Sequence, residues 1–227
     1  MSSSSEQCYS LTHSLIKMSG ALPLLVVFDL DDCLWSPEMY TLSHVPSSKD
    51  TLTGSLGHYS EGVVAVQCGS ECVSDQVRLY PDALTVLQRI YLGEYPDVRI
   101  AAASSADTPL AVRIGRACMS LLEVLPGVTV RDVFDLGWPD GFQGHLQIGR
   151  TAPLTSDKSK THFPILRQVT NIPYDRMFFF DDCNWSDHVE MVTRVCKGVV
   201  GQRTPRGLQL AEWERALATY AARAVHE

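Results

Sequence analysis

Residues 24–35 read LLVVFDLDDCLW, so an apolar run ends abruptly in the carboxylates Asp29, Asp31 and Asp32. The apolar part is short and rich in β-branched and aromatic residues, which is typical of a buried strand in a parallel sheet. Such a strand brings the residues that follow it to the carboxyl edge of the sheet, where open α/β folds bind their ligands. Because side chains alternate along a strand, Asp29 and Asp31 can face the same side.

Carboxylates at so short a spacing repel each other, and the pair would be half protonated unless a cation lies between them. Mg²⁺ is the natural cation for hard oxygen ligands beside a phosphate group. The segment therefore predicts a magnesium site at the end of a buried strand.

The rest of the chain alternates helices and strands. A helix is predicted from Pro81 to Gly93, a strand over 98–103, and a helix from Thr108 through Leu122. A helix over 164–170, a strand over 177–180, a helix over 187–195, a short strand over 198–200 and a terminal helix over 208–224 follow. This alternation predicts a Rossmann-like α/β fold in which helices cover both faces of a parallel sheet.

Two regions interrupt the alternation. Residues 36–78 are too long for a bare loop in a compact domain, so we expect a small flap insertion there and no large cap. Residues 137–155 contain Gly-bearing turns and are expected to be irregular. Residues 21–227 would then form a single domain, preceded by a flexible Ser-rich tail over residues 1–20.

The overall composition excludes several classes of protein. A formal net charge of −7 argues against a general nucleic-acid-binding protein, which needs a basic surface. The sequence has no apolar run near the ~18 residues that a bilayer-spanning helix requires, so no membrane partner is expected. Seven scattered cysteines favour a reduced, cytoplasmic protein over a disulfide framework. The oligomeric state is left open.

Polar side chains gather at the ends of three predicted strands. The set comprises Asp29 and Asp31, Ser104, and Asp181 and Asp182, with Lys158 and Lys160 between the last two strands. Phosphoryl transfer through an aspartate uses such a set: one carboxylate attacks phosphorus, a second acid exchanges protons, and Mg²⁺ reduces the repulsion between the two anions. The hydroxyl and the lysine would bind the oxygens that carry transition-state charge.

Five motifs carry a resemblance to a known family. They are FDLDDCLW (28–35), VRLYP (77–81), AAAS (101–104), THF (161–163) and IPYDRMFFFDD (172–182). In order and spacing they resemble the haloacid dehalogenase-like superfamily, and within it the small magnesium-dependent phosphatases. The likeness extends from Leu24 to the C terminus.

The resemblance implies a role for each matching position. Asp29 would be the nucleophile and a magnesium ligand, and Asp31 the general acid and base, with its backbone carbonyl on the metal. Ser104 would bind a phosphate oxygen, with Ser105 beside it. Asp182 would complete the metal shell, with Asp181 as a neighbouring or alternative ligand. A one-residue insertion leaves Lys158 and Lys160 as rival phosphate-binding lysines, of which Lys158 is favoured.

The chain departs from the family pattern after Ser104, where Ser105 and Ala106 replace an Arg-Thr pair. Loss of a guanidinium there is expected to weaken bidentate recognition of the substrate. The open site that a small flap leaves would admit a phosphoprotein carrying phosphotyrosine, and sugar phosphates if the flap closes. One alternative is a receiver-like signalling module, but its acid pair comes first in the chain, whereas here the pair comes last. Another is a non-catalytic homologue that binds a phosphoprotein without hydrolysing it, and the intact acids argue against this.

Several nearby residues have simpler expected roles. Trp35 and Trp185 follow the two acidic strand ends and are expected to pack as lids over the sheet edge. His162 is expected to be a packing or capping residue, and Asp187 to cap a helix. Cys33 and Cys183 lie beside the acids, which raises the hypothesis that their oxidation switches off activity.

Overall fold

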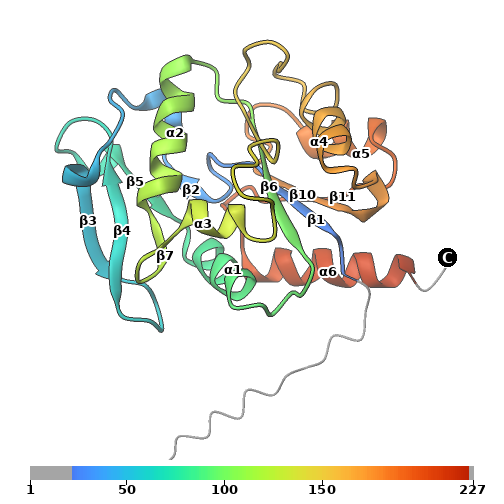
Figure 1. Cartoon of the computed structure of the whole chain (residues 1–227). Helices are drawn as coiled ribbons and strands as arrows, with labels where there is room; N and C mark the ends of the chain where they lie inside the picture. The colour runs from blue at the N-terminus through green and yellow to red at the C-terminus, as the bar shows by residue number, and fades with distance from the viewer. Residues whose placement is uncertain (1–21, 225–227) are drawn as a thin grey trace, which may run out of the picture.

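The apolar run that ends in Asp29 forms the middle strand of a five-stranded sheet, in the order β11-β10-β1-β6-β9 (Figure 1). The computed structural model describes residues 22–224, so the tail expected over residues 1–20 lies outside the described residues. The strands are β1 (Leu25–Phe28), β6 (Arg99–Ser104), β9 (Leu146–Ile148), β10 (Met177–Asp181) and β11 (Val200–Arg203). Each neighbouring pair is parallel, which confirms the predicted fold class.

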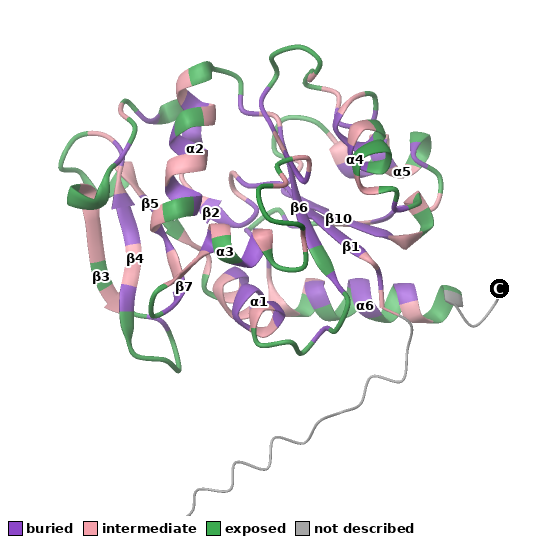
Figure 2. Ribbon diagram, in the orientation of Figure 1, coloured by how far each residue is buried: buried purple, intermediate pink, exposed green. Residues whose placement is uncertain are grey.

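Strand β1 is buried on both faces because helices cover the sheet on each side. Val26 and Phe28 lie in one apolar cluster, and Leu25 and Val27 lie in another. The first cluster receives side chains from α1 (Pro81–Tyr91), α2 (Pro109–Leu121), α3 (Val130–Asp135) and α6 (Leu210–Ala224), and the second from α4 (His162–Thr170) and α5 (His188–Val195). Figure 2 shows the buried strands at the centre of the molecule. This two-sided burial explains why the run in the sequence does not alternate with polar residues.

Helix starts follow ordinary capping chemistry. Pro109 is the first residue of α2, and the Ala111 N–H donates to Thr108 Oγ1 at 3.0 Å. In α5 the Glu190 N–H donates to Asp187 Oδ1 at 3.0 Å, which confirms the expected cap. These caps satisfy backbone donors that the first helical turn leaves free, so both helices begin at a defined residue.

The segment between β1 and α1 folds into a separate antiparallel sheet in the order β2-β5-β4-β3. Its strands are β2 (Trp35–Ser36), β3 (Thr51–Ser55), β4 (Glu61–Gln67) and β5 (Gln76–Leu79), and short 3₁₀ turns lie at η1 (Met39–Thr41), η2 (Ser48–Asp50) and η3 (Val73–Asp75). Figure 1 shows β3 and β4 beyond α2, to one side of the parallel sheet. This small sheet is the only large insertion within residues 22–224, so no separate cap domain is present there.

Several local predictions were wrong. Residues 137–155 were expected to be irregular, but they contain β9, which pairs with β6 and completes the sheet edge. A three-residue strand flanked by glycines carries too little periodicity to be recognised from sequence. Three further short elements were missed: α3, and the strands β7 (Glu123–Leu125) and β8 (Val128–Thr129). Helix α4 begins at His162 and α6 at Leu210, each two residues from the predicted start.

A fourth 3₁₀ turn, η4 (Tyr174–Arg176), leads into β10. Among the helices described over residues 22–224, none combines the length and apolar character needed to cross a bilayer.

Candidate active site

Three acids converge because β1 and β10 are neighbouring parallel strands. The Asp29 N–H donates to the Phe180 carbonyl at 2.8 Å, which places Asp29 beside Asp181 and Asp182 at the carboxyl edge. One carboxylate oxygen from each of the three acids lies within 4.8 Å of the others. All three side chains belong to buried residues. The expected convergence at the strand ends is therefore present.

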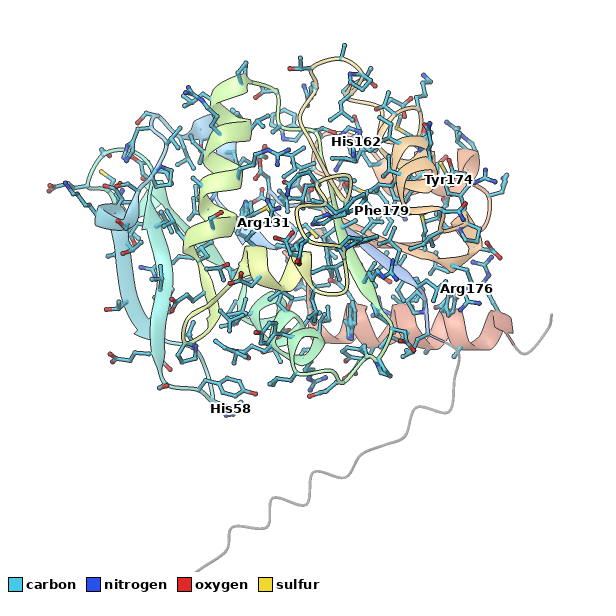
Figure 3. All side chains as sticks on the ribbon, viewed as in Figure 1. His58, Arg131, His162, Tyr174, Arg176 and Phe179 are labelled. Atoms are coloured by element: carbon cyan, nitrogen blue, oxygen red, sulfur yellow. The ribbon has the colours of Figure 1, made fainter. Side chains whose placement is uncertain are left out.

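Lys158 enters this group of acids, whereas Lys160 does not. Lys158 Nζ lies 2.9 Å from Asp29 Oδ1 and 2.6 Å from Asp181 Oδ2, and its side chain is 1% exposed. The ring of Phe179, labelled in Figure 3, lies 5.6 Å from the same nitrogen. Lys160 is 75% exposed in its side chain and pairs with Asp157 at 2.9 Å.

The charges of this cluster do not balance. Burial raises the pKa of Asp29 well above its usual range; Lys158 opposes this shift, and Asp181 and Asp182 add to it. Burial and then Asp181 also raise the pKa of Asp182. For Lys158, burial lowers the pKa, but Asp181 and Asp29 outweigh it and hold the pKa above the usual value. One ammonium group thus faces three carboxylates, and a divalent cation would supply the missing positive charge.

Asp31 lies in the same pocket but faces other partners. Its Oδ1 accepts from Trp35 Nε1 at 2.9 Å, and its Oδ2 accepts from the Met39 N–H at 3.0 Å. Burial raises the pKa of Asp31 to about 7, and the two donors oppose the shift. Asp31 is therefore set apart from the three grouped carboxylates, in a setting where a carboxyl proton is held near neutral pH.

Trp35 does not form a lid. The side chain is fully buried and its ring nitrogen is used to hold Asp31. The prediction for Trp35 was wrong because the chain turns directly after the acids, where the Leu34 N–H donates to the Leu30 carbonyl at 2.9 Å, and β2 then pairs with β5. Trp185, in contrast, is 71% exposed at the pocket mouth, where its Nε1 donates to both carboxylate oxygens of Glu38 at 2.8 and 3.0 Å.

Ser104 ends β6, and the neighbouring loop holds it in place. Ser104 is 3% exposed. Its carbonyl oxygen lies 3.1 Å from His162 Nε2 and 2.9 Å from the Gly149 nitrogen. Burial, and then Lys158, lower the pKa of His162 to about 4, so a neutral imidazole can donate to this carbonyl. His162 is thus a packing residue that also positions the strand end.

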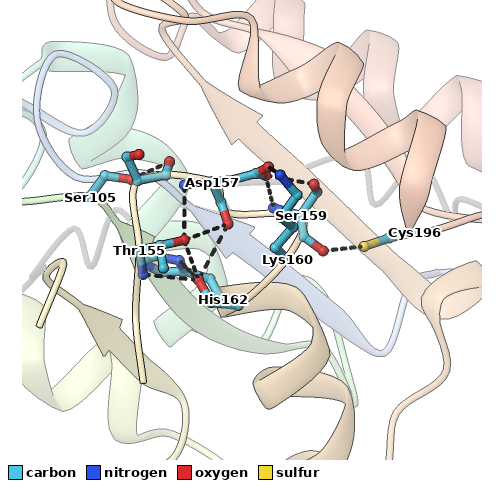
Figure 4. A network of polar contacts seen from close by, with 9 residues as sticks. Ser105, Thr155, Asp157, Ser159, Lys160, His162 and Cys196 are labelled. Atoms are coloured by element: carbon cyan, nitrogen blue, oxygen red, sulfur yellow. Dashed lines mark hydrogen bonds and ion pairs between the residues drawn. The ribbon is translucent and has the colours of Figure 1, made fainter. Parts of the chain in front are cut away.

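The loop that carries Lys158 is held by its own polar contacts (Figure 4). Ser159 Oγ donates to Asp157 Oδ1 at 2.6 Å, and the Thr155 N–H donates to Thr161 Oγ1 at 3.2 Å. Ser105 Oγ donates to the Ser156 carbonyl at 3.4 Å, which ties the loop to the end of β6. This network fixes the backbone from which Lys158 reaches the acids.

These groups line one pocket of about 260 Å³ at the carboxyl edge of the sheet. The predicted residues in its lining are Asp29, Asp31, Ser104, Ser105, Lys158, Asp181 and Asp182. Sequence reasoning missed Glu38, Tyr40, Asp107, Arg150 and His188, which also line it. Nothing in the order of these residues along the chain signals a shared pocket, because they come from segments that are far apart in the sequence.

The cysteines near the site do not favour oxidation. Burial, and then Asp181, raise the pKa of Cys183 to about 12. Cys33 is fully buried, and burial raises its pKa well above the usual value. Because the thiolate is the form that reacts with oxidants, these surroundings disfavour the redox hypothesis.

Comparisons with known proteins agree with this chemistry. The profile of a family described as acid phosphatase matches residues 21–223. A human protein named magnesium-dependent phosphatase 1 is 28% identical over 200 residues, which are 88% of each chain.

Two solved structures are also similar. One is the N-terminal part of the protein BF1531 from Bacteroides fragilis, which contains a phosphatase domain complexed with Mg. It is 13% identical, has a TM-score of 0.42, and its match covers 88% of this chain and 40% of that chain. The other is CbbY from Rhodobacter sphaeroides in complex with phosphate, with 14% identity and a TM-score of 0.40, covering 80% and 87% of the two chains. From the family match over nearly its whole length, the chain belongs to the acid phosphatase family and is a phosphatase, as its motifs predicted.

Proposed function

We propose that the chain is a Mg²⁺-dependent phosphomonoester hydrolase that works through a phosphoryl group carried on Asp29. The observation that carries the proposal is the buried group of Asp29, Asp181 and Asp182, in which one ammonium group, that of Lys158, pairs with Asp29 and Asp181. Such an excess of buried negative charge fits a hard divalent cation with oxygen ligands. Bound there, Mg²⁺ would reduce the repulsion between the anionic nucleophile and its anionic target.

In the first half of the proposed reaction, a carboxylate oxygen of Asp29 attacks phosphorus and the ester P–O bond breaks. Asp31 gives its carboxyl proton to the departing oxygen, since its pKa of about 7 keeps that proton available near neutral pH. Ser104, Ser105 and Lys158 lie in the same pocket and would bind the other phosphoryl oxygens.

In the second half, the Asp31 carboxylate takes a proton from water as that water attacks phosphorus. The bond between phosphorus and the Asp29 oxygen then breaks, which releases inorganic phosphate and leaves Asp29 as a carboxylate and Asp31 protonated again. Lys158 Nζ lies 2.9 Å from Asp29 Oδ1, so it would hold the nucleophile in place. Lys160 has no part in this scheme, because its side chain is exposed and pairs with Asp157.

The metal requirement gives the first test. With the purified chain, hydrolysis of p-nitrophenyl phosphate is expected with Mg²⁺, and EDTA is expected to reduce the rate by at least about a hundredfold. Adding excess Mg²⁺ should restore the rate and should also raise the midpoint of thermal unfolding, because a cation that binds only the folded chain stabilises it. Equal hydrolysis rates with Mg²⁺ and with EDTA would contradict the proposal.

The aromatic side chains at the pocket mouth indicate which class of phosphate ester the site accepts. Trp185 is held at its polar edge by Glu38, and Tyr40 meets it edge-on with ring centroids 6.1 Å apart. The exposed ring of Trp185 is free to stack on a flat leaving group. Of the two candidate substrate classes, we therefore favour aryl phosphates such as phosphotyrosine in a protein over sugar phosphates, with residues 36–78 acting as a small flap.

Replacing Trp185 by alanine tests this preference. We expect kcat/KM for phosphotyrosine to fall by about 2- to 10-fold, the usual worth of one aromatic pair, and kcat/KM for glycerol phosphate to stay unchanged. Val73→Ala is a matched control, since Val73 is equally exposed, at 74%, but does not line the pocket. An equal loss for both esters would mean that Trp185 serves the pocket generally and does not select aryl groups.

We also propose a cellular compartment for the protein. Among the described residues, all six cysteines are free thiols, which is consistent with a reducing compartment such as the cytoplasm.

A further inference from the structure

The pocket has a second cation, Arg150, that comes from a part of the chain expected to be irregular. It follows β9 and lines the same pocket as Asp29 and Ser104. The Gly149 N–H donates to the Ser104 carbonyl at 2.9 Å, so Arg150 directly follows a residue anchored to the end of β6. The backbone of Arg150 therefore lies close to Ser104, whose hydroxyl is proposed to bind phosphate.

The local backbone is built to place Arg150 there. Gly149 has φ +125°, a conformation that residues with a Cβ rarely adopt, and an added Cβ would lie 3.1 Å from Val112. The loop beyond Arg150 is closed by the Leu154 N–H, which donates to the Thr151 carbonyl at 2.9 Å. The chain thus turns sharply at residue 149 and presents residue 150 to the pocket.

The guanidinium of Arg150 is available for a ligand. Across residues 22–224 no hydrogen bond or ion pair engages it. The other arginine near this edge, Arg203, is already paired with Asp187. An arginine that lines a pocket without a carboxylate partner can place its planar donors on an incoming anion.

The charges in the pocket require such a group. Lys158 is already shared by Asp29 and Asp181, and together with a divalent cation it would only balance Asp29, Asp181 and Asp182. Nothing in that set offsets the two negative charges of a phosphoryl group, and Glu38 and Asp107 at the mouth add repulsion. Arg150 and Lys158 are the two basic residues, lysine or arginine, that line the pocket, and of these Arg150 is the one that no carboxylate already pairs with.

We infer that Arg150 binds the non-bridging oxygens of the phosphoryl group. It supplies from the loop after β9 the guanidinium that was expected to be lost because Ser105 and Ala106 follow Ser104. The inference rests on the proposed function in that the substrate is a phosphate monoester. Bidentate recognition of phosphate would then be retained in this chain, through a residue 46 positions beyond Ser104 in the sequence.

Binding of inorganic phosphate tests this assignment without any turnover. With Mg²⁺ present, calorimetric titration should show that Arg150→Ala raises the Kd for phosphate by about 10- to 100-fold, the usual effect of losing charge-assisted hydrogen bonds. Arg150→Lys should recover part of the affinity, because it keeps the charge but loses the fork of donors. Arg113→Ala is the matched control, as Arg113 is an exposed arginine on α2 outside the pocket, and its Kd should stay within about twofold.

Kinetics extend the test to the reacting group. For Arg150→Ala, kcat/KM should fall by a similar factor for p-nitrophenyl phosphate and for glycerol phosphate, because both share only the phosphoryl group. An unchanged Kd for phosphate would overturn the inference. So would a kinetic loss confined to an ester with a second anionic group, such as 4-carboxyphenyl phosphate. If the wild-type chain binds phosphate through Arg150 but shows no Mg²⁺-dependent hydrolysis, the proposed function fails and the assignment of Arg150 stands.

Discussion

Replacing Asp29 by asparagine is expected to abolish turnover while leaving the fold intact. The amide has nearly the same shape but cannot attack phosphorus as an anion, so kcat should fall by at least about a thousandfold. Stability should change little or increase without metal, because burial already disfavours the charged form of Asp29. The measurement is hydrolysis of p-nitrophenyl phosphate with saturating Mg²⁺, together with the midpoint of urea unfolding.

Asp32→Asn is the matched control for this experiment. Asp32 lies three positions further along the chain, outside the group of three carboxylates. Its φ of +52° is one that asparagine tolerates, so the substitution should leave kcat within a few-fold of wild type. A rate for Asp29→Asn above one tenth of the wild-type rate would show that Asp29 is not the nucleophile.

Replacing Lys158 by methionine is expected to have the largest effect on stability. Lys158 is 1% exposed and contacts two buried carboxylates, so its loss leaves both without their partner. Removal of one member of a buried ion pair typically costs about 3–5 kcal/mol. We expect a loss of that order in the free energy of unfolding without divalent cation, and a smaller loss with Mg²⁺, which would take over part of the compensation.

The measurement is urea unfolding of Lys158→Met in EDTA and in Mg²⁺, with hydrolysis followed in parallel. Lys160→Met is the matched control, because its exposed pair with Asp157 should contribute under about 1 kcal/mol. Similar losses of stability for the two variants would mean that Lys158 is not the lysine that compensates the acids. A destabilisation of Lys158→Met that is the same with and without Mg²⁺ would argue against a cation between the carboxylates.

Much of the fold could be read from local pattern. The runs that became β1 and β10 are apolar throughout because both faces of the sheet are covered, and this signal is strong in sequence. The shorter strand β9 escaped prediction, since its position depends on pairing with β6 and not on its own residues. Trp35 was expected as a lid over the sheet edge but lies in the core, because β2 pairs with β5, a strand more than 40 positions further along the chain.

The candidate site divides in the same way. The order of residues was enough to bring Asp29, Ser104 and Asp182 to one edge, because parallel strands end on the same side of a sheet. The choice between Lys158 and Lys160 needed the tertiary structure, since the two lysines lie in one turn and differ only in which of them is buried.

The sequence determined the sheet, its direction and the acids at its end, because these follow from the burial and periodicity of short segments. Tertiary structure alone decided which cations line the pocket with those acids. Arg150 reaches the pocket through β9, Gly149 and a hydrogen bond to Ser104, contacts between residues far apart in the chain. The charge balance in a buried site depends on the distances between such residues, and these distances cannot be predicted from the local sequence.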